Sequence, residues 1–366
     1  MSFSTTIHDV ADPISHERVS VRFESGNLVE KSSSLSGDRD RNIDGSAWWY
    51  LPGLYDADAH MPLVHSGLRD SDRAAALTGG VTRVNVALQW QDIVDLDLRS
   101  LIQDITRWTL PRIVPILSVH SDLDSTGFDT WLAINAEVLR ELLLPPVCKL
   151  YSYGEGFLRN LETVFEAGML PIVYCREFDD VAIVRANARG PVHFRHAMTA
   201  ELVREMKKLP DATLQTSPHF LLPISDDVRA KLHVLPPVAD AETRNAFLPL
   251  VMDEIDLFVT DHNAPPFTTQ EGPGLQVQQE FLPALLTLSE LQGWSLRDVL
   301  HKATTAPAQL FGIPHNAGDF TIVDPTARHT SGLWQPRQTA DRAPFAGLPL
   351  NGRVVAIGNH DAVALL

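Results

Sequence analysis

The sequence predicts an α/β fold, a (β/α)8 TIM barrel with a small β-module beside it. The chain of 366 residues has room for one barrel of this kind. Between residues 51 and 314, eight apolar segments rich in β-branched residues alternate with segments of helical period. Short strand-like segments occupy both ends, residues 1–50 and 315–366. We therefore expect the two ends of the chain to pair with each other in the β-module.

The eight predicted barrel strands follow one another between turn-forming residues. They are residues 50–58, 81–88, 112–119, 147–151, 170–175, 191–196, 212–216 and 255–260. Segments of helical period lie between them, for example 129–144, 158–167 and 199–208. A doubly wound open sheet is the alternative architecture, but no glycine-rich phosphate-binding turn follows the first strand.

The two ends of the chain have a different pattern. Residues 19–23 alternate apolar and polar side chains, which is typical of a strand. Residues 32–46 are polar and rich in turn-forming residues, so we expect an exposed loop there. Near the C-terminus, residues 318–325 predict a strand followed by a turn, and residues 352–358 predict a further strand.

Composition and charge exclude several classes of function. The formal net charge of −16 opposes binding to nucleic acid or to an anionic membrane. Cys148 and Cys175 are the two cysteines of the sequence, too few for a disulfide framework. No apolar run reaches the roughly 18 residues that a membrane span needs, and the first residues do not resemble a secretory signal. We expect a cytoplasmic protein that acts on a small molecule.

The first predicted strand ends in Asp58-Ala59-His60. Side chains two positions apart in a strand project from the same face, about 6–7 Å apart. Asp58 and His60 are therefore placed to share one metal ion. In a TIM barrel the chemistry lies at the C-terminal ends of the strands. The polar side chains predicted there are Asp58, His60, Lys149, Cys175, His196 and Asp261.

Several motifs in this order resemble the amidohydrolase superfamily, and specifically its dihydroorotase, allantoinase and hydantoinase branch. Residues 52–60 resemble the family's P-G-L-I-D-x-H-x-H, and residues 74–82 resemble A-A-A-x-G-G-V-T. Residues 216–220 are similar to T-C-P-H-Y, residues 255–262 to I-D-x-I-A-T-D-H, and residues 318–325 to the closing G-x-x-A-D-L-V-L-x-D-P. The resemblance runs from about Leu51 to the C-terminus and implies a TIM barrel.

The resemblance implies a set of metal ligands. The two histidines of the first strand correspond to Asp58 and His60, and the strand-5 histidine corresponds to Cys175. The lysine that becomes carboxylated in the family corresponds to Lys149. His196 and Asp261 correspond to the remaining histidine and to the aspartate that also serves as general base. Because aspartate and cysteine are also good zinc ligands, the set implies one or two zinc ions.

The substrate-binding positions depart further from the family. The arginine that grips the dihydroorotate carboxylate falls near Pro62, and the asparagine of the second strand corresponds to Gln89. Since a bidentate arginine contact is strong and oriented, its loss argues against dihydroorotate as the substrate. Arg69 and Arg176 are the candidate substitutes, and Gln89 is the third predicted substrate-binding residue.

Three functions remain open at this point, and the third of them is a barrel that binds a small molecule without chemistry. The first is zinc-assisted hydrolysis of the C–N bond of a cyclic amide other than dihydroorotate, with Asp261 moving the proton. The second is a catalytically inactive dihydroorotase homologue with a structural or regulatory role, as a homo-oligomer or as a partner of aspartate carbamoyltransferase. A metal-free site is physically consistent, because a cationic Lys149 can neutralise the carboxylates of Asp58 and Asp261.

Overall fold

A computed structural model covers the whole chain. It describes residues 4–24, 27–33, 35, 41–61, 69–121, 123–142, 144–263, 273–314, 318–331 and 340–366. Pro62, near which the family's substrate-binding arginine falls, lies outside these residues. Within the described part of the chain, no helix combines the length and the apolar character needed to cross a membrane.

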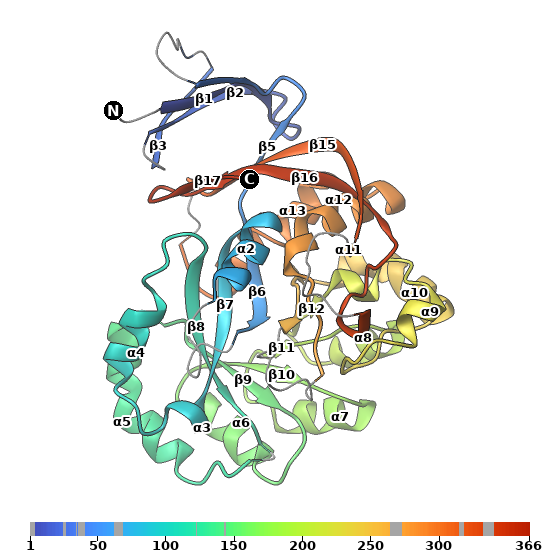
Figure 1. Cartoon of the computed structure of the whole chain (residues 1–366). Coiled ribbons are helices and arrows are strands. Elements are labelled where there is room, and N and C mark those ends of the chain that lie inside the picture. The colour runs from blue at the N-terminus through green and yellow to red at the C-terminus, as the bar shows by residue number, and fades with distance from the viewer. Residues whose placement is uncertain are drawn as a thin grey trace.

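A curled parallel sheet forms the centre of the molecule (Figure 1). Eight strands follow one another around it in chain order: β6 (Leu54–His60), β7 (Val81–Gln89), β8 (Arg112–Val119), β9 (Val147–Tyr151), β10 (Leu170–Tyr174), β11 (His193–Phe194), β12 (Thr213–Thr216) and β13 (Leu257–Phe258). The short strand β14 (His262–Asn263) continues the chain of β13 and pairs in parallel with β6. The first and last strands therefore meet, and the predicted TIM barrel is confirmed.

Helices lie between successive strands and cover the outside of the sheet (Figure 1). In the first half of the barrel they are α2 (Asp70–Thr78), α3 (Trp90–Ile93), α4 (Leu98–Ile105), α5 (Phe128–Glu141), α6 (Phe157–Glu166) and α7 (Phe178–Asn187). In the second half they are α8 (Ala200–Met206), α9 (Asp226–Arg229), α10 (Ala241–Phe247), α11 (Val251–Glu254), α12 (Phe281–Gln292), α13 (Leu296–His301) and α14 (Thr305–Leu310).

A second, mixed sheet joins the two ends of the chain. Its N-terminal strands are β1 (Ser4–Ala11), β2 (Arg18–Glu24), β3 (Asn27–Ser32), β4 (Arg41–Asp44) and β5 (Trp49–Pro52). Its C-terminal strands are β15 (Phe320–Thr330), β16 (Pro349–Gly358) and β17 (Val363–Leu365). The two sets meet where β15 pairs antiparallel with β5. The β-module predicted from the two ends is thus present, while the boundaries at residues 50 and 314 stay predictions.

Two local predictions were wrong. The expected loop over residues 32–46 contains β4, which pairs in parallel with β1. The single strand expected over residues 50–58 is two strands, β5 in the mixed sheet and β6 in the barrel, which separate at Gly53. A Cβ atom at Gly53 would lie 2.3 Å from Cγ2 of Thr82, so only glycine allows the chain to pass this point.

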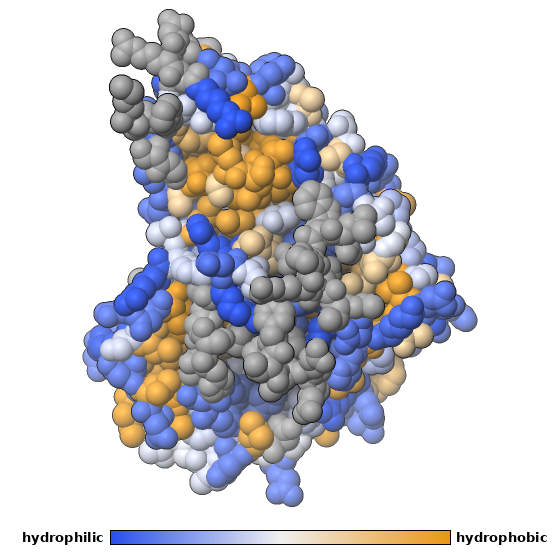
Figure 2. Space-filling view, viewed as in Figure 1, coloured by the Kyte–Doolittle hydropathy of each residue, from blue (hydrophilic) through white to orange (hydrophobic). Residues whose placement is uncertain are grey.

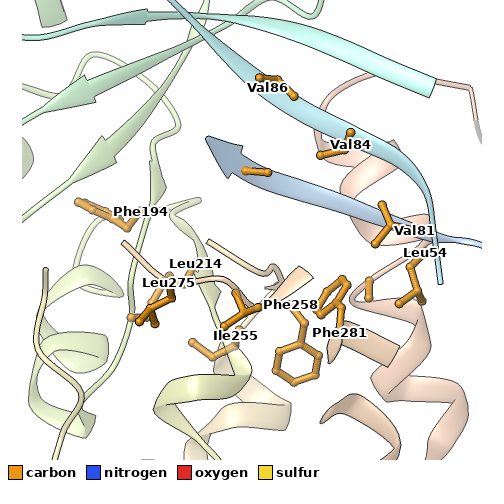
Figure 3. Close-up of a cluster of buried hydrophobic side chains, with 14 of the residues drawn as sticks. Leu54, Val81, Val84, Val86, Phe194, Leu214, Ile255, Phe258, Leu275 and Phe281 are labelled. Atoms are coloured by element: carbon orange, nitrogen blue, oxygen red, sulfur yellow. The ribbon is translucent and has the colours of Figure 1, made fainter. Parts of the chain in front are cut away.

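The main core joins barrel strands to the helices around them, and a second, smaller cluster contains Val114, Ile116, Val147 and Ile172 of β8, β9 and β10. Figure 3 shows side chains from β6, β7, β13 and α12 converging in it, including Leu54, Val81, Phe258 and Phe281. The mixed sheet has its own core, in which the ring of Phe320 is stacked against those of Phe23 and Tyr50. Figure 2 shows a broad apolar area at the level of this sheet. The two cores together fix the β-module beside the barrel.

Replacing Phe320 by alanine tests the core of the β-module. Its side chain is fully buried, with ring centroids 5.9 Å from Phe23 and 5.6 Å from Tyr50. We expect Phe320→Ala to lower the free energy of unfolding by about 3–5 kcal/mol, measured by urea denaturation. Phe178, which is 51% exposed, provides the matched control, and Phe178→Ala should cost no more than about 0.5 kcal/mol. Equal losses in the two variants would contradict the assigned packing.

Candidate functional site

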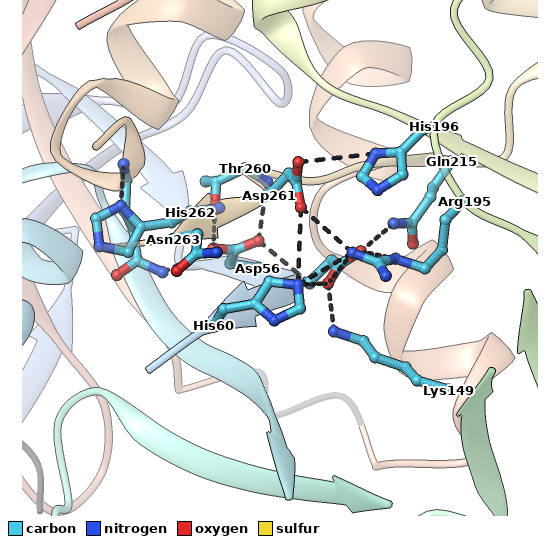
Figure 4. Close-up of polar contacts among 12 residues, drawn as sticks. Asp56, His60, Lys149, Arg195, His196, Gln215, Thr260, Asp261, His262 and Asn263 are labelled. Atoms are coloured by element: carbon cyan, nitrogen blue, oxygen red, sulfur yellow. Dashed lines mark hydrogen bonds and ion pairs between the residues drawn. The ribbon is translucent and has the colours of Figure 1, made fainter. Parts of the chain in front are cut away.

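Five of the predicted strand-end residues lie together at one mouth of the barrel (Figure 4). Asp58 and His60 come from β6, Lys149 comes from β9, and the other two follow β11 and β13. The side chains of Asp58 and Lys149 are fully buried, whereas that of His60 is 24% exposed. The cluster is therefore an almost completely desolvated group of charges that reaches the surface through His60.

Asp58 is the centre of this cluster. One of its carboxylate oxygens accepts a hydrogen bond from Nζ of Lys149. The other accepts hydrogen bonds from Nε of Arg195, at 2.7 Å, and from the side-chain amide of Gln215. A buried carboxylate is stable only when it is paired and its oxygens are hydrogen-bonded, and these three donors meet that requirement.

Arg195 joins the other members of the site to Asp58. Its Nη2 atom lies 3.3 Å from Oδ1 of Asp261 and 3.1 Å from Nε2 of His60. Because a guanidinium can only donate hydrogen bonds, Nε2 of His60 must be unprotonated and act as the acceptor. The guanidinium thus sits between the two carboxylates and the imidazole, with 2% of its side chain exposed.

Arg195 and Gln215 are not among the site residues predicted from the sequence. A usable signal was present, since His193 and Arg195 lie two positions apart and share a face of the strand. His193 is fully buried and bonds to Gln215 at 2.9 Å. The same alternation therefore directs Arg195 to the barrel interior.

Two site residues adopt left-handed backbone conformations. The φ angle is 54° at both His196 and Asp261. Residues without glycine's freedom rarely adopt positive φ, and such strain concentrates at functional sites. Here it turns the chain at the ends of two strands, and it brings Nδ1 of His196 to 3.8 Å from Oδ2 of Asp261.

The electrostatic surroundings keep both histidines neutral. Burial lowers the pKa of His60 well below its usual value, and the positive charges of Lys149 and Arg195 lower it further. Burial and the charge of Arg195 lower the pKa of His196 in the same way. Neutral imidazoles can act as hydrogen-bond acceptors or metal ligands, but they add no positive charge to the site.

The surroundings shift the pKa values of Asp58 and Asp261 in opposite directions. Burial opposes the ionisation of Asp58, but Arg195 and Lys149 outweigh it and hold its pKa well below the usual value. For Asp261, burial together with the negative charge of Asp58 raises the pKa to about 7. Asp58 is therefore the permanent anion of the site, and Asp261 is the group that titrates near neutral pH.

The cluster contains the residue types that hold metal ions. Ligand atoms of Asp58, His196 and Asp261 all lie within 4.8 Å of one another. However, Arg195 donates to the carboxylates of Asp58 and Asp261, and the ammonium group of Lys149 donates to Asp58. A divalent cation placed here would lie against two cations of the protein itself. In this arrangement the donor set does not fit a metal ion.

Cys175 is placed differently from the other predicted ligands. Its side chain is 1% exposed and belongs to the main hydrophobic cluster. Burial raises the pKa of its thiol, with the Ser152 hydroxyl as a polar neighbour. The thiolate is the form that binds metals, so burial disfavours the form that ligation needs.

The predicted substrate-binding residues have partners of their own. Gln89 donates a hydrogen bond to Gln91, and Arg69 makes two hydrogen bonds of 2.8 Å to Asp72. The guanidinium of Arg176 stacks 3.5 Å above the ring of Tyr153. None of these three contacts involves the Asp58 cluster.

A second buried carboxylate, that of Asp56 in β6, links the segments around the site by hydrogen bonds. Oδ1 of Asp56 accepts the backbone N–H of Thr260, at 3.0 Å. Its Oδ2 accepts the hydroxyl of Thr260 and, at 2.6 Å, the side-chain amide of Gln278. Burial raises the pKa of Asp56 to about 6. These bonds tie β6 to the strand that carries Asp261, and so fix the separation of the two site carboxylates.

Comparison with known proteins gives relatives at the sequence level. No family model matches the chain. It is 28% identical over 200 residues to a dihydroorotase of Bacillus subtilis, a match that covers 48% of this chain and 46% of that protein. It is 24% identical over 386 residues to a dihydroorotase of Methanothermobacter thermautotrophicus, covering 91% and 88%. A multifunctional protein, pyr1-3 of Dictyostelium discoideum, is 25% identical over 185 residues, which is 8% of its length.

Solved structures share the fold over the whole chain. The dihydropyrimidinase from Brevibacillus agri superposes with a TM-score of 0.73 and 16% identity, covering 100% of this chain and 95% of the other. A D-hydantoinase superposes with a TM-score of 0.75, also at 16% identity and with the same coverage. The sequence relatives and the shared barrel together place the chain in the amidohydrolase superfamily. Within that superfamily it lies on the dihydroorotase and hydantoinase branch.

The pKa of Asp261 generates a prediction about pH. Because its pKa is raised from 3.8 to about 7, the folded protein holds this proton more tightly than the unfolded chain does. The contribution of Asp261 to the free energy of unfolding should therefore fall as the pH rises from about 4 to 7. Carbon-13 NMR of labelled aspartates should show one carboxyl titrating near pH 7 that disappears in Asp261→Asn. Titration of this carboxyl in the ordinary acid range would contradict the assignment.

The pairing of Asp58 with Arg195 generates a prediction about stability. Arg195→Met removes one of the two cations that neutralise a fully buried carboxylate, and should lower the free energy of unfolding by about 3–5 kcal/mol. The pair of Arg107 and Asp104, whose side chains are 76% and 63% exposed, is the control, and Arg107→Met should cost less than about 1 kcal/mol. Adding Asp58→Asn to Arg195→Met should restore part of the loss. A double variant as unstable as the sum of the single ones would show that the two residues are not coupled.

Proposed function

We propose that this chain is a non-hydrolytic homologue of the cyclic amidohydrolases, with a structural or regulatory role. The observation that carries the proposal is the position of the Arg195 guanidinium, which lies between Asp58, Asp261 and His60. These are the side chains that the resemblance assigns to metal binding. Their lone pairs are directed at a cation that belongs to the protein.

The chemistry of amide hydrolysis supports this proposal. A bound zinc ion lowers the pKa of water from 15.7 to about 7 and so supplies hydroxide at neutral pH. An arginine can neutralise carboxylates in the same place, but it offers no open coordination position for a water molecule. Asp261, the expected general base, is itself hydrogen-bonded to Arg195. Arg195 and Lys149 therefore neutralise the carboxylates as a metal ion would, but they do not supply a hydroxide nucleophile.

One observation favours a second function, zinc-assisted hydrolysis of a cyclic amide other than dihydroorotate. Asp58, His196 and Asp261 present ligand atoms close enough together for one ion. Binding would require Arg195 to leave the cluster and Lys149 to give up its bond to Asp58. Carboxylation of Lys149 belongs to this alternative alone, because a carbamate cannot act as the ammonium donor seen here.

Metal analysis of the purified protein separates the two functions. After incubation with zinc and gel filtration, we expect far less than one zinc ion per chain by mass spectrometry, and no ring opening of dihydroorotate, hydantoin or allantoin. The double variant Asp58→His/Arg195→Ala is the matched comparison, since it removes the central cation and restores the family's His-x-His. It should retain more zinc than the natural chain.

The opposite outcome would establish the hydrolase. Near-stoichiometric zinc in the natural chain, lost in Asp261→Ala together with a measurable ring-opening activity, would overturn the proposal. Circular dichroism of each variant ensures that a loss of zinc is not a loss of fold.

A structural or regulatory role would require this chain to bind another protein chain. The aspartate carbamoyltransferase implied by the resemblance is the first candidate. Analytical ultracentrifugation of this chain alone and mixed with that enzyme provides the test. A heavier complex that contains both chains would support the role. Sedimentation of the two proteins as separate species would exclude this partner and leave self-association as the form of assembly to be measured.

A further inference from the structure

A large cavity lies on the outside of the barrel, between α5 and α6. Its volume is about 530 Å³. Its apolar lining includes Leu117 of β8, Leu132 of α5 and Met169, which follows α6. None of its lining residues belongs to the Asp58 cluster, so this cavity is separate from the site at the barrel mouth.

Small side chains explain why the cavity exists. Ala133 and Ala136 are three positions apart on α5, so they lie on one face of the helix, and both line the cavity. Ala167 and Gly168 line it from the end of α6. Helices normally close such a gap by interlocking their larger side chains. Small residues at these positions leave the space between the two helices partly unfilled.

The lining of the cavity is mostly apolar, and its charged side chains are Arg140, Asp129 and Glu166. Arg140 lines it at the last turn of α5. In the described parts of the chain, Arg140 has no ion pair and no hydrogen bond. The two lining carboxylates do not neutralise it: Asp129 is eleven residues earlier on α5, about 16 Å away along the helix axis, and Glu166 lies 3.7 Å from Arg189.

We propose that this cavity binds an elongated apolar molecule that ends in a single carboxylate. Its volume lies in the range of about 300–1,000 Å³ that is typical of small-molecule sites, which combine an apolar lining with a few polar groups. The apolar body lies over Leu117 and Leu132, and the carboxylate meets Arg140, which suits paired recognition of a carboxylate. The proposal is independent of whether the barrel mouth hydrolyses a substrate.

A purely structural role for Arg140 would lead to a different experimental result. An arginine in the last turn of a helix is stabilised by the helix dipole, whether or not a ligand binds. If that were its whole role, Arg140→Gln would alter the stability of the protein and leave any ligand preference unchanged. The experiment therefore has to measure preference for the acid over a neutral molecule of the same shape.

Decanoate and decanol are the probes, titrated into the full chain by isothermal calorimetry. We expect saturable binding of decanoate, weakened about tenfold in Arg140→Gln, with decanol binding unchanged in the same variant. Ala136→Trp fills the cavity and should abolish the binding of both probes. Ile134→Trp is the matched control, because Ile134 is on the same helix, is 73% exposed and does not line the cavity.

Several results would overturn the proposal. They are the absence of saturable decanoate binding to the natural chain, equal effects of the two tryptophan variants, and an unchanged ratio of decanoate to decanol affinity in Arg140→Gln. If Ala136→Trp does not fold, as judged by circular dichroism, Ala133→Leu provides a smaller obstruction. This variant should weaken both probes, and unchanged affinity would count against the site.

Discussion

The arrangement of side chains at the barrel mouth depends on the fully buried carboxylate of Asp58. Removing such a charge from water is costly unless cations and hydrogen bonds replace its hydration. Lys149 reaches it from β9, Arg195 follows β11, and Gln215 comes from β12, so donors from three different strands converge on one side chain. The alignment of these strand ends and the neutral state of His60 both depend on this convergence.

The proposed non-hydrolytic role rests on the same arrangement. Metal sites hold several electron-rich groups together by a positive charge at their centre. In this chain the positive charge is covalently part of the protein, since the Arg195 guanidinium takes the central place between Asp58 and Asp261. Under the proposed role, this guanidinium holds the carboxylates of the mouth together as a metal ion would, but it offers no open coordination position of the kind that hydrolysis depends on.

The mixed sheet and the cavity beside α5 both lie away from the barrel mouth. The mixed sheet brings both ends of the chain together through β5 and β15, and its stacked rings of Phe23, Tyr50 and Phe320 give it a core of its own. The outer layer is less uniformly packed, because small residues on α5 and just after α6 leave a cavity that Arg140 also lines. The barrel can therefore carry a second binding site without disturbing the charges at its mouth.

The sequence by itself determined the barrel, because alternating apolar segments and the order of the motifs are local properties that can be read along the chain. It also identified Asp58, His60, Lys149, His196 and Asp261 as strand-end residues, which the structure brings together. Only the tertiary structure showed that Arg195 and Gln215 complete the cluster, since their partners lie 137 and 157 residues away. Local pattern places a side chain on a strand face, but the charge balance of a buried site depends on which distant strands meet there.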